Sequence, residues 1–161
     1  MADVLTHVLV GYIIGQLLAF RYDWMEPHHI TLVMIGALSP DFVKINLVVP
    51  DELVQAVLGI PFSWSPLHTL GGSVLVILLG SLLLAPEYRR HAILLFLIGA
   101  LSHHALDLAL LNASGYSYAV FWPITEYRPP SGDLYRSSDP WPALVAAVGA
   151  ALVWSSNHRR C

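Results

Sequence analysis

Long apolar runs alternate with short polar stretches along the chain, and this pattern predicts membrane-spanning helices. A helix that crosses the hydrocarbon core of a bilayer needs about 20 mostly apolar residues. We predict five spans, at residues 4–20, 30–49, 67–85, 91–111 and 141–156. The last one is bracketed by Trp141 and Trp154, as expected for interfacial anchors. The pattern therefore favours an all-α fold, a polytopic membrane helical bundle in which residues 1–161 form a single integral membrane domain.

One span and two polar segments depart from this simple alternation. The run at residues 30–49 is broken by Ser-Pro-Asp at 39–41, so we expect its helix to end near Pro40 and an extended or re-entrant piece to follow. Residues 51–62 predict a short amphipathic helix at the interface. Residues 112–140 form the longest polar loop, and its aromatic residues suit the headgroup layer.

The composition agrees with a membrane protein and excludes several other classes. Hydrophobic residues make up 56% of the chain and charged residues 12%, against about 25% charged residues in typical soluble domains. This balance excludes a disordered chain, and the net charge of -3 excludes a basic nucleic-acid-binding domain. The single cysteine, Cys161, excludes a disulfide scaffold. We therefore expect membrane lipids as partners and no nucleic acid.

The basic residues predict how the chain lies in the membrane. With five spans, one side of the membrane has five basic residues and the other has three. The first set is Arg21, Arg89, Arg90, Arg159 and Arg160, and the second is Lys44, Arg128 and Arg136. Lysine and arginine are enriched in cytoplasmic loops. We therefore expect a multi-pass protein of the cell membrane with its N-terminus outside and its C-terminus in the cytoplasm.

Several ionisable residues lie inside the apolar runs, where charge is costly and usually serves a function. They are His7, Asp41, His68, His103, His104 and Asp107. None is lysine or arginine, so a divalent cation with carboxylate and imidazole ligands explains them better than salt bridges do. Because successive helices run in opposite directions, all of them except His104 are expected to converge at the same outer level of the membrane.

Helical spacing refines this candidate metal site. His103 and Asp107 are four residues apart and share a helix face, whereas His104 is rotated by about 100° and is expected to face elsewhere. Glycines at spacings of four mark close helix contacts in membranes, and they accompany three of the histidines. They are Gly11 and Gly15 with His7, Gly72 with His68, and Gly99 with His103. The ligand candidates therefore point into the bundle, and a polar structural cluster is the alternative to a metal site.

Five short segments resemble the YdjM-like family of membrane-bound metal-dependent hydrolases. They are THVLVG at 6–11, GALSPD at 36–41, PLHT at 66–69, LSHHALD at 101–107 and FWP at 121–123. The same order of His, Asp, His and HxxxD also resembles the metal core of zinc-dependent phospholipase C and the S1/P1 nucleases. Unlike those phospholipases, this chain has no histidine between Asp107 and His158, which argues against a third metal.

The resemblance implies a role for each matching residue. Asp41, His68, His103 and Asp107 would hold one zinc ion, and Asp107 would bridge to a second ion also bound by His7. A zinc-activated water would attack phosphorus, with Asp41 and His68 as the catalytic residues and Asp41 doubling as general base.

Beyond the family motifs, Arg128 is the best candidate for binding the phosphate, because arginine makes bidentate contacts to it. An interfacial arginine that only snorkels is the alternative.

We therefore expect a membrane-embedded metal-dependent hydrolase that cleaves a phosphoester, such as a lipid headgroup, near the outer leaflet. A transporter or channel for divalent metals or protons is an alternative, although the inner halves of the first, third and fourth spans are almost wholly apolar. A non-catalytic protein that a metal stabilises is another alternative that the sequence leaves open.

Overall fold

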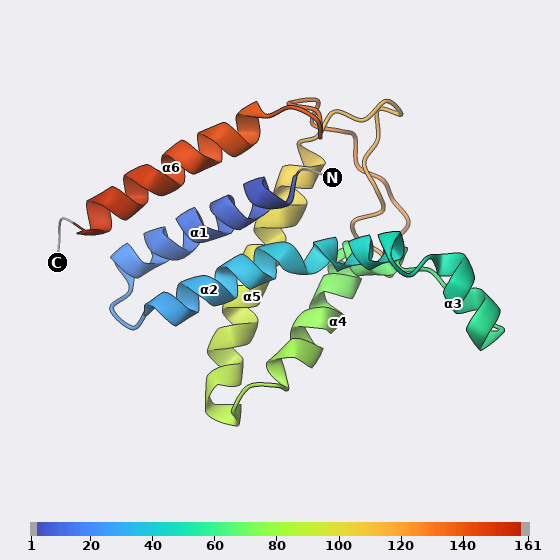
Figure 1. Ribbon diagram of the computed structural model, residues 1–161, viewed down its shortest axis with the longest axis horizontal. Coiled ribbons are helices and arrows are strands. Elements are labelled where there is room, and N and C mark those ends of the chain that lie inside the picture. Colours follow the sequence, from blue (N-terminus) through green and yellow to red (C-terminus); the bar gives the residue numbers. More distant parts are fainter. Residues whose placement is uncertain (1–2, 159–161) are drawn as a thin grey trace.

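The computed structural model describes residues 3–158, and this part of the chain is all-helical. Its elements are α1 (Val4–Arg21), α2 (Pro27–Leu38), η1 (Ser39–Leu47), α3 (Asp51–Leu58), η2 (Ser65–His68), α4 (Leu70–Ser81), α5 (Pro86–Leu108) and α6 (Trp141–His158), where η denotes a 3-10 helix. Helices α6, α1 and α2 lie side by side, α5 crosses α2, and α4 packs beside α5 (Figure 1). The predicted all-α membrane bundle is confirmed.

Local sequence signals explain where several helices begin. The side chain of Asp3 accepts a hydrogen bond from the Thr6 backbone N–H and caps α1. Thr69 caps α4 in the same way through the Gly72 N–H. Helices α2 and α5 each have a proline in the first turn, where a backbone N–H is not needed.

The second predicted span ends its α-helix where expected but continues differently. Helix α2 ends at Leu38, and residues 39–47 form the 3-10 helix η1 rather than an extended or re-entrant piece. Pro40 has no N–H for the Gly36 carbonyl, which instead accepts from the backbone N–H and the hydroxyl of Ser39. The chain therefore tightens into a 3-10 helix instead of leaving the helical path.

Three helical segments of the described chain are long and apolar enough to cross a membrane. They are Val4–Arg21, Pro27–Leu47 and Pro86–Leu108. The predicted span at 67–85 contains α4, which has only 12 residues because η2 occupies its start. At 1.5 Å per residue such a helix covers about 18 Å of a core about 30 Å thick. The predicted span at 141–156 lies within α6, which is not one of these three segments. The helix predicted at 51–62 is α3, which ends earlier, at Leu58.

Glycines allow α2 and α5 to cross with their backbones in contact. A Cβ atom at Gly36 would lie 2.3 Å from the Phe96 carbonyl oxygen, and one at Gly99 would lie 2.1 Å from the Val33 carbonyl oxygen. Small residues permit such close crossings in membranes. The crossing brings Ala37 of α2 against the turn of α5 that follows Gly99.

The other predicted glycine contacts are also close. Helix α1 packs on α2 through Gly11 and Gly15, where a Cβ would lie 3.0 Å from Ala37 Cβ and 2.7 Å from Ile30 Cγ2, respectively. A Cβ at Gly72 would lie 2.0 Å from the Pro66 carbonyl oxygen. The glycine spacing thus identified the buried faces of α1 and α5. It was wrong for Gly72, because His68 belongs to η2 and not to the same helix as Gly72, so the two do not share one helix face.

Candidate metal centre

Five of the ionisable residues predicted to converge do lie together in the interior. His7 comes from α1, Asp41 from η1, His68 from η2, and His103 and Asp107 from α5, and all five are buried. The side chains of His7, His103 and Asp107 form one group whose ligand atoms lie within 4.8 Å of one another, and Asp41, His68 and His103 form a second such group. The four elements therefore meet at one cluster of metal-ligating side chains.

The carboxylate of Asp107 lies at the centre of this cluster. Its Oδ2 is 2.8 Å from His68 Nε2 and 3.5 Å from His103 Nε2. Its Oδ1 is 3.5 Å from His7 Nε2. Because its two oxygens face different histidines, Asp107 has the arrangement that a bridging carboxylate needs.

Two backbone carbonyls orient two of the imidazoles. His103 Nδ1 lies 2.8 Å from the Ala37 carbonyl oxygen, and His68 Nδ1 lies 3.1 Å from the Pro40 carbonyl oxygen. A carbonyl can only accept, so each Nδ1 carries the proton and donates it. The lone pair of a neutral ring is then on Nε2, which faces the Asp107 carboxylate. Histidines that bind metals are usually held by such an N–H to carbonyl bond.

The buried polar atoms without a hydrogen-bond partner also fit a cation. Among the described residues they include both ring nitrogens of His7, Nε2 of His103 and Oδ1 of Asp41. Leaving such an atom unsatisfied costs about 1–3 kcal/mol. Because the Pro40 carbonyl puts the proton of His68 on Nδ1, the lone pair of Nε2 faces the negatively charged Oδ2 of Asp107 at 2.8 Å. These two atoms repel each other unless a cation, or a second proton on the ring, lies between them. The residues present therefore fit a metal ion.

His103 limits how many ions the cluster can share. Its Nδ1 is engaged with Ala37, so only Nε2 remains for a ligand bond, although both groups of metal-ligating side chains include this residue. His103 can therefore serve one ion at a time. A second ion would have to bind His7 and the Oδ1 atom of Asp107, which lie 3.5 Å apart. The ring of His7 also stacks on the ring of His103, with 3.7 Å between the centroids.

The sequence reasoning missed one basic residue at this site. Lys44 Nζ lies 2.6 Å from Asp41 Oδ2, so the cluster does have a lysine neighbour. The two residues are three apart in η1, and a 3-10 helix has three residues per turn, which puts them on the same face. Because that segment was expected to leave the helical path, the spacing carried no signal. Oδ1 of Asp41 remains directed into the interior without a hydrogen-bond partner among the described residues.

His104 is rotated away from Asp107, as predicted from its position on the helix, but its ring still lies beside the cluster, 5.9 Å from the ring of His68 between centroids. Its Nε2 lies 2.9 Å from Ser73 Oγ and its Nδ1 lies 2.6 Å from the Tyr118 hydroxyl. Burial, together with the nearby Asp107 carboxylate, raises the pKa of Tyr118 well above its usual value, so the phenol stays protonated. Both ring nitrogens of His104 have partners, and it is not among the candidate ligands.

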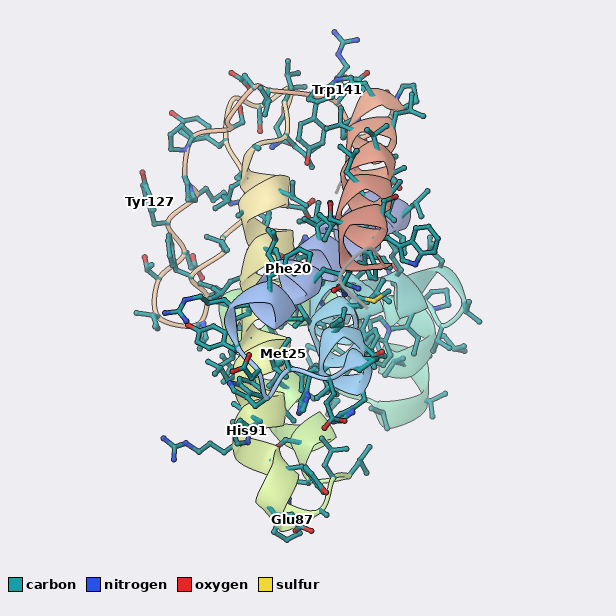
Figure 2. The ribbon with its side chains drawn as sticks, turned by 90° about the vertical axis from the view of Figure 1, so that its left-hand side faces the viewer. Phe20, Met25, Glu87, His91, Tyr127 and Trp141 are labelled. Atoms are coloured by element: carbon teal, nitrogen blue, oxygen red, sulfur yellow. The ribbon has the colours of Figure 1, made fainter. Side chains whose placement is uncertain are left out.

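Two cavities open beside the cluster, with volumes of about 560 Å³ and about 320 Å³. His68, Tyr118 and Arg128 line both of them. Arg128 belongs to the long loop between α5 and α6, which lies along the part of the bundle away from Glu87 and His91 at the start of α5 (Figure 2). The structure therefore places the predicted phosphate-binding residue on the same cavity walls as a candidate metal ligand.

A family model described as YdjM inner membrane protein matches residues 1–161. No curated protein and no solved structure matches the chain.

Proposed function

The chain belongs to the YdjM inner membrane protein family, and from this premise we propose that its buried cluster is the metal centre of a membrane-embedded hydrolase that cleaves a phosphoester. One observation carries the proposal. His68 and His103 each donate Nδ1–H to a backbone carbonyl and direct Nε2 at the Asp107 carboxylate. This is the arrangement that fixes imidazole ligands around a metal.

In this proposal Asp41, His68, His103 and Asp107 would hold the first ion, and His7 with Asp107 would hold a second one. The mixed imidazole and carboxylate donors suit zinc. When bound, zinc polarises phosphoryl oxygens and lowers the pKa of a water molecule to near neutrality. The buried position excludes bulk water from the donors, which strengthens their interaction with a cation.

The other residues have roles that follow from their positions. His68 is the ligand candidate that lines both cavities, so a substrate reaches the centre beside it. Lys44 binds the outer oxygen of the Asp41 carboxylate, so only the inward Oδ1 is available. This oxygen would either bind the first ion or, with His68, His103 and Asp107 alone holding that ion, accept the proton of the attacking water. Arg128 binds the phosphoryl oxygens through its guanidinium group.

We also propose that the centre lies near the outer leaflet, with the N-terminus outside and the C-terminus in the cytoplasm. Arg21 ends α1 and Arg89 lies at the start of α5, so both are at the ends of their helices that are remote from the cluster. The positive-inside rule assigns that end of the bundle to the cytoplasm.

Metal analysis of the purified protein tests the centre. We expect about one or two zinc ions per chain in the wild type and a large loss in His68→Ala and Asp107→Ala. His28→Ala is the matched control, because His28 is an exposed histidine of α2, and it should keep its zinc. Equally negligible metal in all four proteins would overturn the proposal.

Turnover tests the hydrolase itself. Zinc-loaded protein should hydrolyse bis(p-nitrophenyl) phosphate, a reactive phosphodiester, and chelation should abolish the reaction. The second candidate function is a structural metal clamp, which is favoured by the fact that the cluster joins α1, η1, η2 and α5. A zinc-loaded protein that turns over no phosphoester but unfolds on chelation would establish the clamp instead.

A further inference from the structure

The two cavities that meet at His68 differ in character. The larger one has mostly apolar walls that include Val43, Pro66, Ala119 and Trp122. The smaller one is lined by polar groups that include Asn112, Ser114, Ser117 and Asp107. Because His68, Tyr118 and Arg128 belong to both linings, a ligand at this shared wall would extend into an apolar space on one side and a polar space on the other.

Ser117 marks the polar cavity as a binding site. The residue is only 4% exposed, and its hydroxyl has no hydrogen-bond partner within the described part of the chain. An unsatisfied buried hydroxyl is unfavourable, so it calls for a ligand that donates to it or accepts from it. The metal cluster does not account for this group, because Ser117 is not one of its ligand candidates.

The loop that carries Ser117 is braced, so the hydroxyl has a defined place. The Ser117 backbone N–H donates to the Pro129 carbonyl at 2.8 Å, and Tyr116 and Pro130 form an isolated antiparallel β-bridge. Nearby, the Gly132 N–H donates to the Leu108 carbonyl at the end of α5 at 2.8 Å. These bonds tie the loop to itself and to the helix that carries Asp107.

The apolar cavity has an equally defined wall. The Leu70 N–H donates to the Val120 carbonyl at 2.9 Å and the Gly71 N–H donates to the Trp122 carbonyl at 3.1 Å. A Cβ at Gly71 would lie 2.4 Å from Pro123 Cδ, so only glycine lets the loop approach α4 this closely. The segment with Trp122 is thereby held against the start of α4. A cavity of about 560 Å³ is within the usual range for ligand pockets, about 300–1,000 Å³.

We propose that the substrate is an amphiphilic phosphoester that spans the two cavities. Its phosphoryl group lies at the shared wall beside His68 and Arg128, its polar group enters the small cavity and bonds Ser117, and its hydrocarbon chain fills the large one. This assignment rests on the proposed hydrolase function. Hydrolysis forms a bond between the water oxygen and phosphorus and breaks one ester P–O bond. A water proton passes to the oxygen of the leaving alcohol.

Chain length tests the apolar cavity. Zinc-loaded protein is assayed with hexadecyl phosphodiesters of choline, ethanolamine and glycerol, and with the hexyl diesters of the same three headgroups. We expect kcat/KM to fall by at least about tenfold from hexadecyl to hexyl, because the shorter chain leaves apolar surface of the cavity in water. The tailless diester bis(p-nitrophenyl) phosphate serves as the reference for hydrolysis alone.

Ser117→Ala tests the polar cavity. We expect kcat/KM for whichever of the three headgroups is hydrolysed best to fall about tenfold, because one hydrogen bond to the headgroup is lost. Ser131→Ala is the matched control, since that hydroxyl bonds Asp133 in the same loop and lines neither cavity. Thermal unfolding verifies that both variants fold.

The outcomes separate the inference from the function on which it rests. If bis(p-nitrophenyl) phosphate is hydrolysed but neither chain length nor Ser117→Ala changes kcat/KM, the amphiphilic substrate is wrong and the hydrolase remains. If zinc-loaded protein hydrolyses none of the diesters, the proposed function is wrong and the inference falls with it.

Discussion

Histidines gather at both ends of this bundle, but the two clusters are built differently. At one end His7, His68 and His103 surround Asp107 in the interior, whereas at the other end His28, His29 and His91 lie near Trp24 and Glu26 at the surface. We call the first, buried set the inner cluster and the second, surface set the outer cluster; the names refer to burial in the bundle and not to the two leaflets of the membrane. The same residue type therefore occurs in two environments within one chain.

The partners of the rings show what separates the clusters. In the outer cluster His29 Nδ1 accepts from the Glu26 N–H at 3.0 Å and acts as a helix cap, and His28 Nδ1 lies 3.4 Å from the exposed Glu26 carboxylate. Only residues of the inner cluster and Asp41 form compact metal-ligating groups in the described chain. Histidines become ligand candidates here through burial and a central carboxylate and, for His68 and His103, through carbonyls that fix their tautomers.

The gain in the free energy of unfolding on zinc binding should distinguish the two clusters most strongly, because only the inner cluster is expected to bind zinc. At a zinc concentration about 100 times the Kd, the wild type should gain about 2.7 kcal/mol in its free energy of unfolding. Asp107→Asn should gain almost nothing, because the neutral amide cannot neutralise the cation between the histidines. Chemical denaturation with and without zinc measures both values. Glu26→Gln in the outer cluster is the control and should behave as the wild type, so an equal loss in this variant would contradict the distinction.

The helix crossing that supports the inner cluster should be nearly as sensitive. Gly99→Val should lower the free energy of unfolding by about 2 kcal/mol and reduce zinc binding, because its side chain would overlap the α2 backbone at Val33 and Ala37. Gly80→Val is the matched control, since a Cβ at Gly80 has no neighbour within 4 Å. If Gly99→Val kept both its stability and its zinc, close packing of α2 on α5 would not be what positions His103.

Substitution of Lys44 should have the smallest effect on stability, and its effect on zinc affinity tests whether Asp41 binds the ion. Lys44→Met should raise zinc affinity several-fold, because it removes a positive charge 2.6 Å from Asp41 Oδ2. The zinc-free protein should lose no more than about 1 kcal/mol in its free energy of unfolding, since the lysine is 34% exposed and the pair is partly screened. Lys44→Arg keeps the charge and should leave both quantities unchanged. Lower zinc affinity in Lys44→Met would show that Lys44 supports the ion through Asp41.

Much of the inner cluster was predictable because it depends on properties that the sequence encodes directly. Apolar runs located the helices, and reversal of direction from one span to the next brought distant polar residues to one level. The spacing of four between Asp107 and His103, and between His103 and Gly99, showed which face of the helix is buried. The same rotation argument sent His104 to another face, where Ser73 and Tyr118 bind it.

The sequence by itself determined an all-helical membrane bundle and the set of buried histidine and aspartate residues, because hydrophobicity and helical period are local properties of the chain. Only the tertiary structure decided the short α4, the 3-10 path that puts Lys44 on Asp41, and the cavity that Ser117 lines. It also decided which carbonyls hold His68 and His103. Every residue carries a backbone carbonyl, so the amino-acid type at a position does not reveal whether its carbonyl will face an imidazole. The packing of one helical segment against another decides which carbonyl does.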